Sequence, residues 1–253
     1  VAVGYDALDA NTTADNNTAI GYAALGANTT GAHNTAVGKQ ALANNTTSDN
    51  NTAVGYQSLE ENTTGTKNAA MGAYALHNNT TGDNNTALGY GALDANTTAD
   101  GNTAVGRAAL AANTTGYDNV AVGHLAATAV TTGIRNDAVG KGALNALTTG
   151  NSNSAVGYYA GGALTTGAYN VAIGRAALST ATTSESNTAV GYNAAYSATI
   201  GNTNTSIGRE AMYTNVAADR NTALGYRSLY TMSRSTTADT YNVAVGNEAG
   251  YSC

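Results

Sequence analysis

The sequence lacks several residue types that ordinary globular proteins use. It contains no Pro, no Trp and no Phe, a single Cys, and only 10% charged residues. One cysteine excludes an internal disulfide framework; Cys253 ends the sequence, and we interpret it as a cut point or a free thiol. The absence of Pro suits a chain in which many backbone N–H groups donate to β-ladder hydrogen bonds, and disordered segments are usually richer in Pro and charge. We therefore expect an ordered chain with an extensive backbone hydrogen-bond network.

The charge and hydropathy patterns exclude two classes of partner. The 16 acidic and 10 basic residues give a formal net charge of −6, and they include no basic run, so we expect no nucleic-acid binding. No stretch approaches the ~20 apolar residues that a membrane-spanning helix needs. We predict no membrane span in this segment.

What the sequence does contain is a repeat of 17 residues, each unit of which begins with Asn. The unit starts are Asn17, Asn34, Asn51, Asn68, Asn85, Asn102, Asn119, Asn136, Asn153, Asn170, Asn187, Asn204 and Asn221. The next unit begins at Asn242, after a four-residue insertion within Thr231–Tyr241. We therefore predict a tandem-repeat region over 1–241 and a last partial repeat over 242–253 that leads to a junction or a cut end. Because Val1 lies in mid-repeat, we also expect the sequence to be a segment of a longer polypeptide.

The unit reads Asn-Thr-Ala-Val-Gly-Tyr-x-Ala-Leu-x-x-Asn-Thr-Thr-Gly-x-x, as in 51–67. With the first Asn as position 1, positions 2 to 4 predict a short β-strand, and the Gly at position 5 (Gly21, Gly38, Gly55) predicts a positive φ or a close backbone approach. Gly, Asn and Thr in every unit disfavour a helical hairpin. The repeat therefore predicts an all-β fold, a parallel β-solenoid of about fifteen coils, whose coils would be spaced ~4.8 Å apart.

The small apolar content of a coil favours self-association. A coil that contributes one Val and one Leu buries little surface, and at ~25 cal/mol per Å² this barely offsets ~1 kcal/mol of backbone entropy per residue. Packing three such solenoids around a common axis would bury more. We therefore predict a parallel homotrimer.

Equal positions of a solenoid form rows, and the row at position 6 is the most informative. It alternates aromatic and cationic side chains at Tyr22, Lys39, Tyr56, Tyr90, Arg107, Lys141, Tyr158, Arg175, Tyr192, Arg209 and Tyr226. Neighbours in such a row are close enough for cation–π contacts. Two interpretations remain open: a ladder that stabilises the fold, or a surface-binding strip for a glycan or another surface.

Other rows predict structural roles. Asn17, Asn34, Asn51, Asn68, Asn85 and Asn102 predict an amide ladder. Asn-x-Thr sequons occur at Asn11, Asn28, Asn62, Asn96 and Asn113, where turn and ladder chemistry explains them equally well. Asp49, Asp83 and Asp100 lie near the closing turn but lack the pattern of calcium-binding rolls.

No catalytic constellation is visible, and we predict neither an enzyme nor a cofactor or metal site. His33, His77 and His124 occupy different repeat positions, and Glu60 with Glu61 is interpreted as a solvated face. The Thr rows suggest an ice-binding solenoid as a remote alternative, although adjacent Thr residues should point to opposite faces.

The pentapeptides at 119–123, 170–174 and 242–246 resemble the head repeats of YadA-type trimeric autotransporter adhesins. The resemblance implies a left-handed parallel β-roll, with three chains side by side and this pentapeptide as the inner strand. The full unit also looks like shaft repeats of phage tail fibres and of fibre proteins from predatory bacteria. The resemblance implies an extracellular shaft or stalk of a trimeric adhesin on a bacterial surface or a virion, associating with itself and end to end in a longer fibre. The alternatives are a phage tail-fibre shaft and a module that binds a host surface or a cell-surface glycan.

Overall fold

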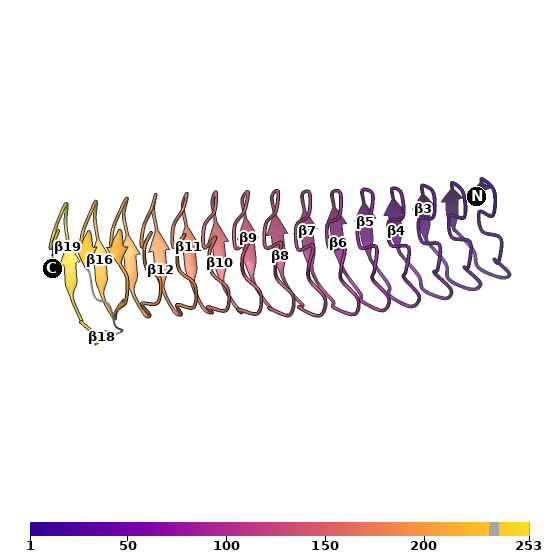
Figure 1. Ribbon diagram of the computed structural model, residues 1–253. Helices are drawn as coiled ribbons and strands as arrows, with labels where there is room; N and C mark the ends of the chain where they lie inside the picture. Colours follow the sequence, from indigo (N-terminus) through magenta and orange to yellow (C-terminus); the bar gives the residue numbers. More distant parts are fainter. Residues whose placement is uncertain (233–237, 253) are drawn as a thin grey trace. The chain divides into compact units, whose positions relative to one another are not determined.

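The computed structural model describes residues 1–232 and 238–252. These residues form a parallel β-solenoid of about 14 turns, built from short strands joined by turns, and none of them lies in a helix (Figure 1). No segment of this part of the chain could therefore cross a membrane as a helix. The chain divides into two compact units, 1–125 and 126–253.

The first unit contains one short strand per coil. The strands are β1 (Ala2–Val3), β2 (Thr18–Ile20), β3 (Thr35–Val37), β4 (Thr52–Val54), β5 (Ala69–Met71), β6 (Thr86–Leu88), β7 (Thr103–Val105) and β8 (Val120–Val122). Within this unit, neighbouring strands pair in parallel, and the partners are equal repeat positions, such as Ala36 with Ala53. The sequence period is therefore the register of the sheet.

The second unit continues the same pattern. Its main strands are β9 (Asp137–Val139), β10 (Ser154–Val156), β11 (Val171–Ile173), β12 (Thr188–Val190), β13 (Thr205–Ile207), β16 (Thr222–Leu224) and β19 (Val243–Val245). Two further parallel pairs flank the insertion, β14 (Thr214–Asn215) with β17 (Thr231–Met232) and β15 (Ala218–Asp219) with β18 (Ala238–Asp239). Part of the insertion (233–237) and Cys253 lie outside the described residues.

The core of each coil is narrower than the sequence suggests. Position 3 is buried, as at Ala36 and Ala155, together with the small residue at position 8 and the Leu at position 9. The aliphatic residue at position 4 faces outward: Leu88 is 46% exposed and Val156 is 42% exposed. The expectation that a coil buries its Leu is confirmed, but the expectation that it buries the Val of the strand was wrong, because the inward side chain of the strand is Ala.

Two rows of asparagine fill the rest of the coil in the first unit. At position 1, the backbone N–H of Asn51 donates to Oδ1 of Asn34 at 2.9 Å, and Nδ2 of Asn34 donates to the Ser48 carbonyl at 2.8 Å. At position 12, Nδ2 of Asn62 donates to Oδ1 of Asn45 at 3.0 Å. Because buried polar groups need partners, these two amide ladders fix the spacing of neighbouring coils.

The turns use backbone conformations that are unusual for side-chain-bearing residues. Positions 7, 9 and 17 have a positive φ, as in Ala23 (52°), Leu25 (51°) and His33 (61°). At position 5, Gly21 has a φ of 137°, and a Cβ there would lie 2.4 Å from the Gly38 carbonyl oxygen. Only glycine fits at position 5, because the next coil approaches its backbone too closely for a side chain.

Candidate binding surface

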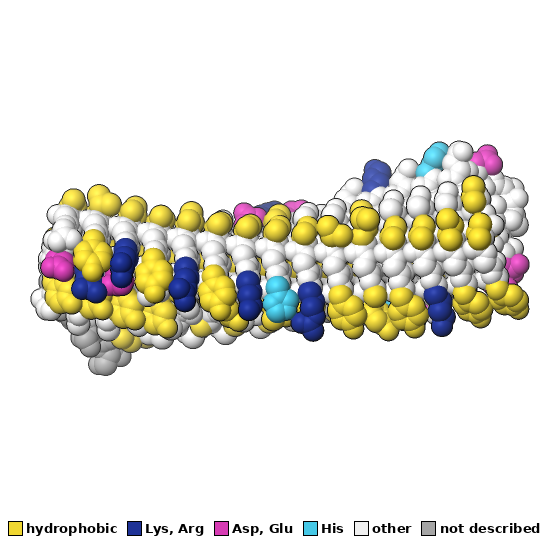
Figure 2. Space-filling model, turned by 90° about the horizontal axis from the view of Figure 1, so that it is seen from above, with side chains coloured by type: hydrophobic (Ala, Val, Ile, Leu, Met, Phe, Trp, Pro, Cys, Tyr) yellow, Lys and Arg dark blue, Asp and Glu magenta, His cyan; other side chains and the backbone are white. Residues whose placement is uncertain are grey.

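The residues at position 6, which we call the aromatic–cationic strip, lie directly after the glycine that ends each strand. In both units this strip runs alongside the exposed aliphatic residues of position 4 (Figure 2). The strand turns at the glycine, so that the next side chain points away from the core. Tyr22 is 49% exposed and Tyr158 is 47% exposed.

Cations and rings of the strip contact each other within each unit. In the first unit, Nζ of Lys39 lies 5.8 Å from the ring centroid of Tyr22 and 5.7 Å from that of Tyr56. In this unit Nη1 of Arg107 also lies 3.1 Å from Nε2 of His124. Each exposed cation–π contact is worth about 0.5–1 kcal/mol, so the strip contributes to the stability of the fold.

The second unit shows the same alternation over a longer run. The guanidinium of Arg175 lies 5.7 Å from the ring centroids of both Tyr158 and Tyr192. Arg209 lies 5.6 Å from the Tyr192 ring and 5.7 Å from the Tyr226 ring. Each of these rings is therefore flanked by cations, which leaves its exposed edge available to solvent.

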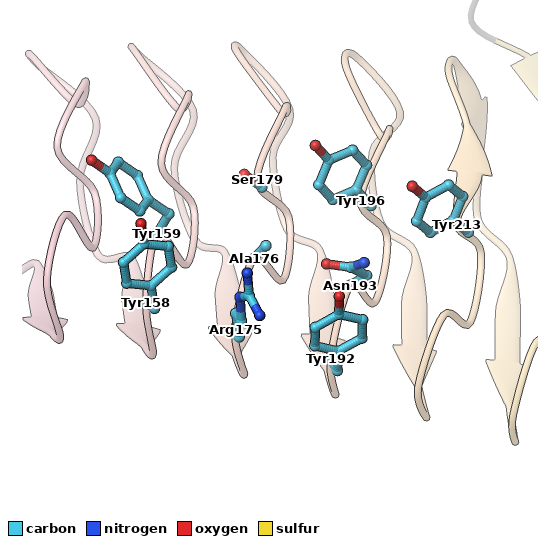
Figure 3. Close-up of a pocket in the computed structure, with 9 residues that line it drawn as sticks. All are labelled: Tyr158, Tyr159, Arg175, Ala176, Ser179, Tyr192, Asn193, Tyr196 and Tyr213. Atoms are coloured by element: carbon cyan, nitrogen blue, oxygen red, sulfur yellow. The ribbon is translucent and has the colours of Figure 1, made fainter.

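A groove of about 330 Å³ lies beside the strip in the second unit (Figure 3). One side consists of the strip residues Tyr158, Arg175 and Tyr192. The other side consists of Tyr159 and the three residues of position 10, which are Ser179, Tyr196 and Tyr213. Ala176 and Asn193 lie between the two sides.

The tyrosines of position 10 form a stack that sequence reasoning missed. The ring centroids of Tyr196 and Tyr213 are 5.2 Å apart, those of Tyr213 and Tyr230 are 5.2 Å apart, and those of Tyr230 and Tyr251 are 4.9 Å apart. The rings are nearly parallel, with interplanar angles of 4–6°. Burial raises the pKa of the Tyr213 hydroxyl. The signal in the sequence was the recurrence of Tyr at one repeat position in the last four units.

An ion pair lies next to this stack. Nε of Arg227 donates to Oε2 of Glu210 at 2.7 Å, and Nη2 of Arg209 lies 3.3 Å from the other carboxylate oxygen. The hydrogen bond from Arg227 holds the pKa of the Glu210 carboxyl below its ordinary value. Glu210 is therefore neutralised by its own neighbours and is unavailable to repel an anion.

In the first unit, position 10 carries a different column. Nδ1 of His77 lies 3.4 Å from Oε2 of Glu60, whose other oxygen accepts a hydrogen bond from Gln40 at 2.9 Å. Glu60 is only 7% exposed, and burial raises the pKa of its carboxyl, as it does for Asp94. The interpretation of Glu60 as part of a solvated face was wrong, because the turn directs it toward Gln40 and His77.

The acids of the closing turn bind backbone N–H groups. Oδ1 of Asp49 accepts a hydrogen bond from the Ala32 N–H at 2.7 Å, and Oδ1 of Asp100 accepts one from the Asp83 N–H at 2.7 Å. Asp83 bonds Thr66 in the same way. Within residues 1–232 and 238–252, no group of three or more His, Cys, Asp or Glu side chains could hold a metal ion.

The threonines of position 13 form hydrogen bonds within the fold, and most of the sequon asparagines are buried. At position 13, the hydroxyl of Thr63 donates to the Thr80 carbonyl at 3.0 Å, and the same contact recurs along the row. The sequon residues Asn28, Asn62, Asn96 and Asn113 are fully buried in the amide ladder of position 12. The folded chain therefore does not present these four asparagines to a glycosylating enzyme.

Comparison with known protein families and with curated proteins finds no match to this sequence.

Proposed function

We propose that this chain is a structural segment of a surface-displayed fibre: a shaft or stalk of a trimeric adhesin, wound as a left-handed parallel β-roll. The observation that carries the proposal is the repetition of one coil, which is hydrogen-bonded in the same register to its neighbour throughout each unit. Such a fold gains length by adding equal units. It provides extension without a catalytic centre, and we expect no turnover on polysaccharides.

The exposed aliphatic column supports self-association. Position 4 places an apolar side chain on the outer side of each strand, and the column includes Ile20, Met71 and Leu88 in the first unit and Val156, Ile173 and Leu224 in the second, each 41–47% exposed. Contiguous apolar surface of this kind is typical of an interface. Three parallel chains in one register would bring equal residues of this column together around a common axis.

The mass of the assembly in solution tests the proposal. One chain has a mass of 25.2 kDa, and we expect light scattering to give the mass of three chains at micromolar concentration. Electron micrographs of the same sample should show slender particles, and protease treatment of intact cells or virions should release this segment. A single-chain mass over the whole concentration range would contradict the trimer, and compact particles would contradict the shaft.

A further inference from the structure

We infer that the groove between Tyr158 and Tyr213 is a binding site for an acidic sugar, meaning a pyranose that bears a carboxylate. This inference goes beyond the shaft role, since a fibre segment needs no ligand site along its side. The volume of about 330 Å³ lies within the range of about 300–1,000 Å³ that is usual for small-molecule sites.

The groove exists because the sequence interrupts two rows of large side chains at this place. At position 10, Tyr fills the row from Tyr196 onward, but the preceding coil has Ser179. At position 7, Ala176 follows Tyr159. The hollow is therefore bounded by rings and is open above small side chains (Figure 3).

The orientation of Tyr159 widens this hollow. A Cβ at Gly142 would lie only 2.8–3.0 Å from ring carbons of Tyr159, so the ring lies over a glycine of the preceding coil and away from Ala176. Tyr159 also packs edge to face on Tyr158, with ring centroids 4.7 Å apart. These contacts hold the ring as one end of the groove.

The lining matches the two kinds of surface that a sugar presents. The C–H face of a pyranose packs on an aromatic ring, whose face is electron-rich, and the hydroxyl groups at its edge need hydrogen-bonding partners. Tyr158 and Tyr192, 47% and 40% exposed, offer ring edges. Tyr196 stacks on Tyr213 with one face, and its other face lies toward Ser179, where the preceding coil carries no ring. The Asn193 side-chain amide makes no hydrogen bond to any other described residue, and it lies between the two sides of the groove.

The charge of the groove selects an acidic sugar. Arg175 lies between two rings and has no acidic partner among the described residues, so its guanidinium N–H groups are free to bind a carboxylate in the bidentate geometry that arginine favours. No acidic side chain lines the groove, and nearby Glu210 is held by Arg209 and Arg227. The chain's net charge of −6 disfavours a long polyphosphate such as DNA.

Titration calorimetry on the intact chain, with a panel of short oligosaccharides, tests the site. The acidic probes are tetramers of galacturonate, glucuronate and mannuronate together with a sialylated trisaccharide, and the neutral tetramers of galactose, glucose and mannose serve as ligand controls. We expect at least one acidic probe to bind and the matching neutral sugar to bind more weakly. Arg175→Gln should weaken that binding about tenfold, because it removes a charge-assisted hydrogen-bonding group.

A second variant fills the groove without removing a charge. Ser179→Tyr would extend the stack of Tyr196 and Tyr213 by one ring, and it uses the residue that the following coils already carry at this position. We expect it to fold, as judged by circular dichroism, and to lose binding at least about tenfold. Arg107→Gln and Ala111→Tyr place the same changes at the same repeat positions of the first unit, and they should leave affinity within about twofold.

Three results would overturn the site. The first is that no acidic probe binds. The second is equal weakening by Arg107→Gln and Arg175→Gln, which would mean that the whole strip binds diffusely. The third is equal affinity for acidic and neutral sugars with no effect of Arg175→Gln. None of these results bears on the number of chains in the assembly, so the shaft proposal is tested separately.

Discussion

The backbone N–H of Asn51 donates a hydrogen bond to the side-chain oxygen of Asn34, 17 residues earlier, at 2.9 Å. Both residues are fully buried. The same amide of Asn34 donates to the Ser48 carbonyl, so that one side chain satisfies backbone groups of two segments. The asparagine side chains therefore link neighbouring coils through hydrogen bonds in the interior, as backbone hydrogen bonds link the strands of the sheet.

Replacing Asn34 by Ala should destabilise the fold strongly. It leaves the buried Asn51 N–H without this partner, which costs roughly 1–3 kcal/mol, while the Ser48 carbonyl keeps a hydrogen bond from Nδ2 of Asn45 at 3.2 Å. Urea denaturation followed by circular dichroism measures the loss. Asn44→Ala is the matched control, since its side chain makes only an exposed contact with Glu61, and it should change stability by less than about 0.5 kcal/mol. Equal stability of the two variants would contradict the role of the ladder.

Replacing Ala108 by Gly should stabilise the chain. Ala108 has a φ of 53°, a conformation that costs a side-chain-bearing residue roughly 1–2 kcal/mol, and the gain is partly offset by the greater unfolded-state entropy of Gly. We expect a net gain of up to about 1 kcal/mol in the free energy of unfolding. Ala111→Gly, in the same coil but without a positive φ, should instead lose about 0.5–1 kcal/mol. A loss in both variants would argue against strain at position 7.

The ion pair of Glu210 and Arg227 predicts a specific pH dependence. Because the folded-state pKa of Glu210 is lowered, its contribution to stability is present above the ordinary value of 4.5 and is lost as the pH falls through the lowered folded-state value. Glu210→Gln should therefore unfold at lower urea concentration than the parent chain at pH 7, and the difference should vanish in strong acid. Glu61→Gln is the exposed control. A difference that persists unchanged at pH 2 would exclude the ion pair as its cause.

Charges placed in the aliphatic column should dissociate the proposed trimer. Leu88→Lys together with Val156→Lys introduces two cations per chain into the outer side of the strands, and like charges would meet when equal residues pack around an axis. Light scattering should then give the mass of one chain, with the β-type circular dichroism retained. Thr81→Lys with Thr166→Lys adds the same charge at exposed turn positions and should leave the mass unchanged. An unchanged mass in the first variant would place any interface elsewhere on the chain.

The period of the sequence was sufficient to predict the β-solenoid and its register, because a 17-residue step in sequence becomes a one-coil step in space. It was not sufficient to predict which side of the strand faces inward. Alternation shows only that neighbouring side chains point in opposite directions, and the larger Val was assumed to be buried. In the folded coil, the asparagine row of position 1 and the Leu of position 9 already occupy the interior, joined in the first unit by a second asparagine row, and the inward side chain of the strand is the small residue of position 3.

The groove was harder to predict than the strip beside it. The strip follows from one repeat position that alternates between Tyr and a cation. The groove depends on what is missing at Ala176 and Ser179, and on a glycine, Gly142, that lets the Tyr159 ring lie over the preceding coil. Such a site arises where the sequence departs from the repeat. The repeat pattern alone therefore does not predict it.

The amide ladder also survives the one place where the period changes. The N–H of Asn242 donates to Oδ1 of Asn221 at 3.1 Å although 21 residues separate them, and β19 pairs with β16 in parallel. The four extra residues of this unit are thus accommodated without loss of alignment in the coil that follows. A foreign peptide for display could therefore be grafted into the sequence between Asn221 and Asn242, where the hydrogen bond between these two asparagines keeps the following coil in register.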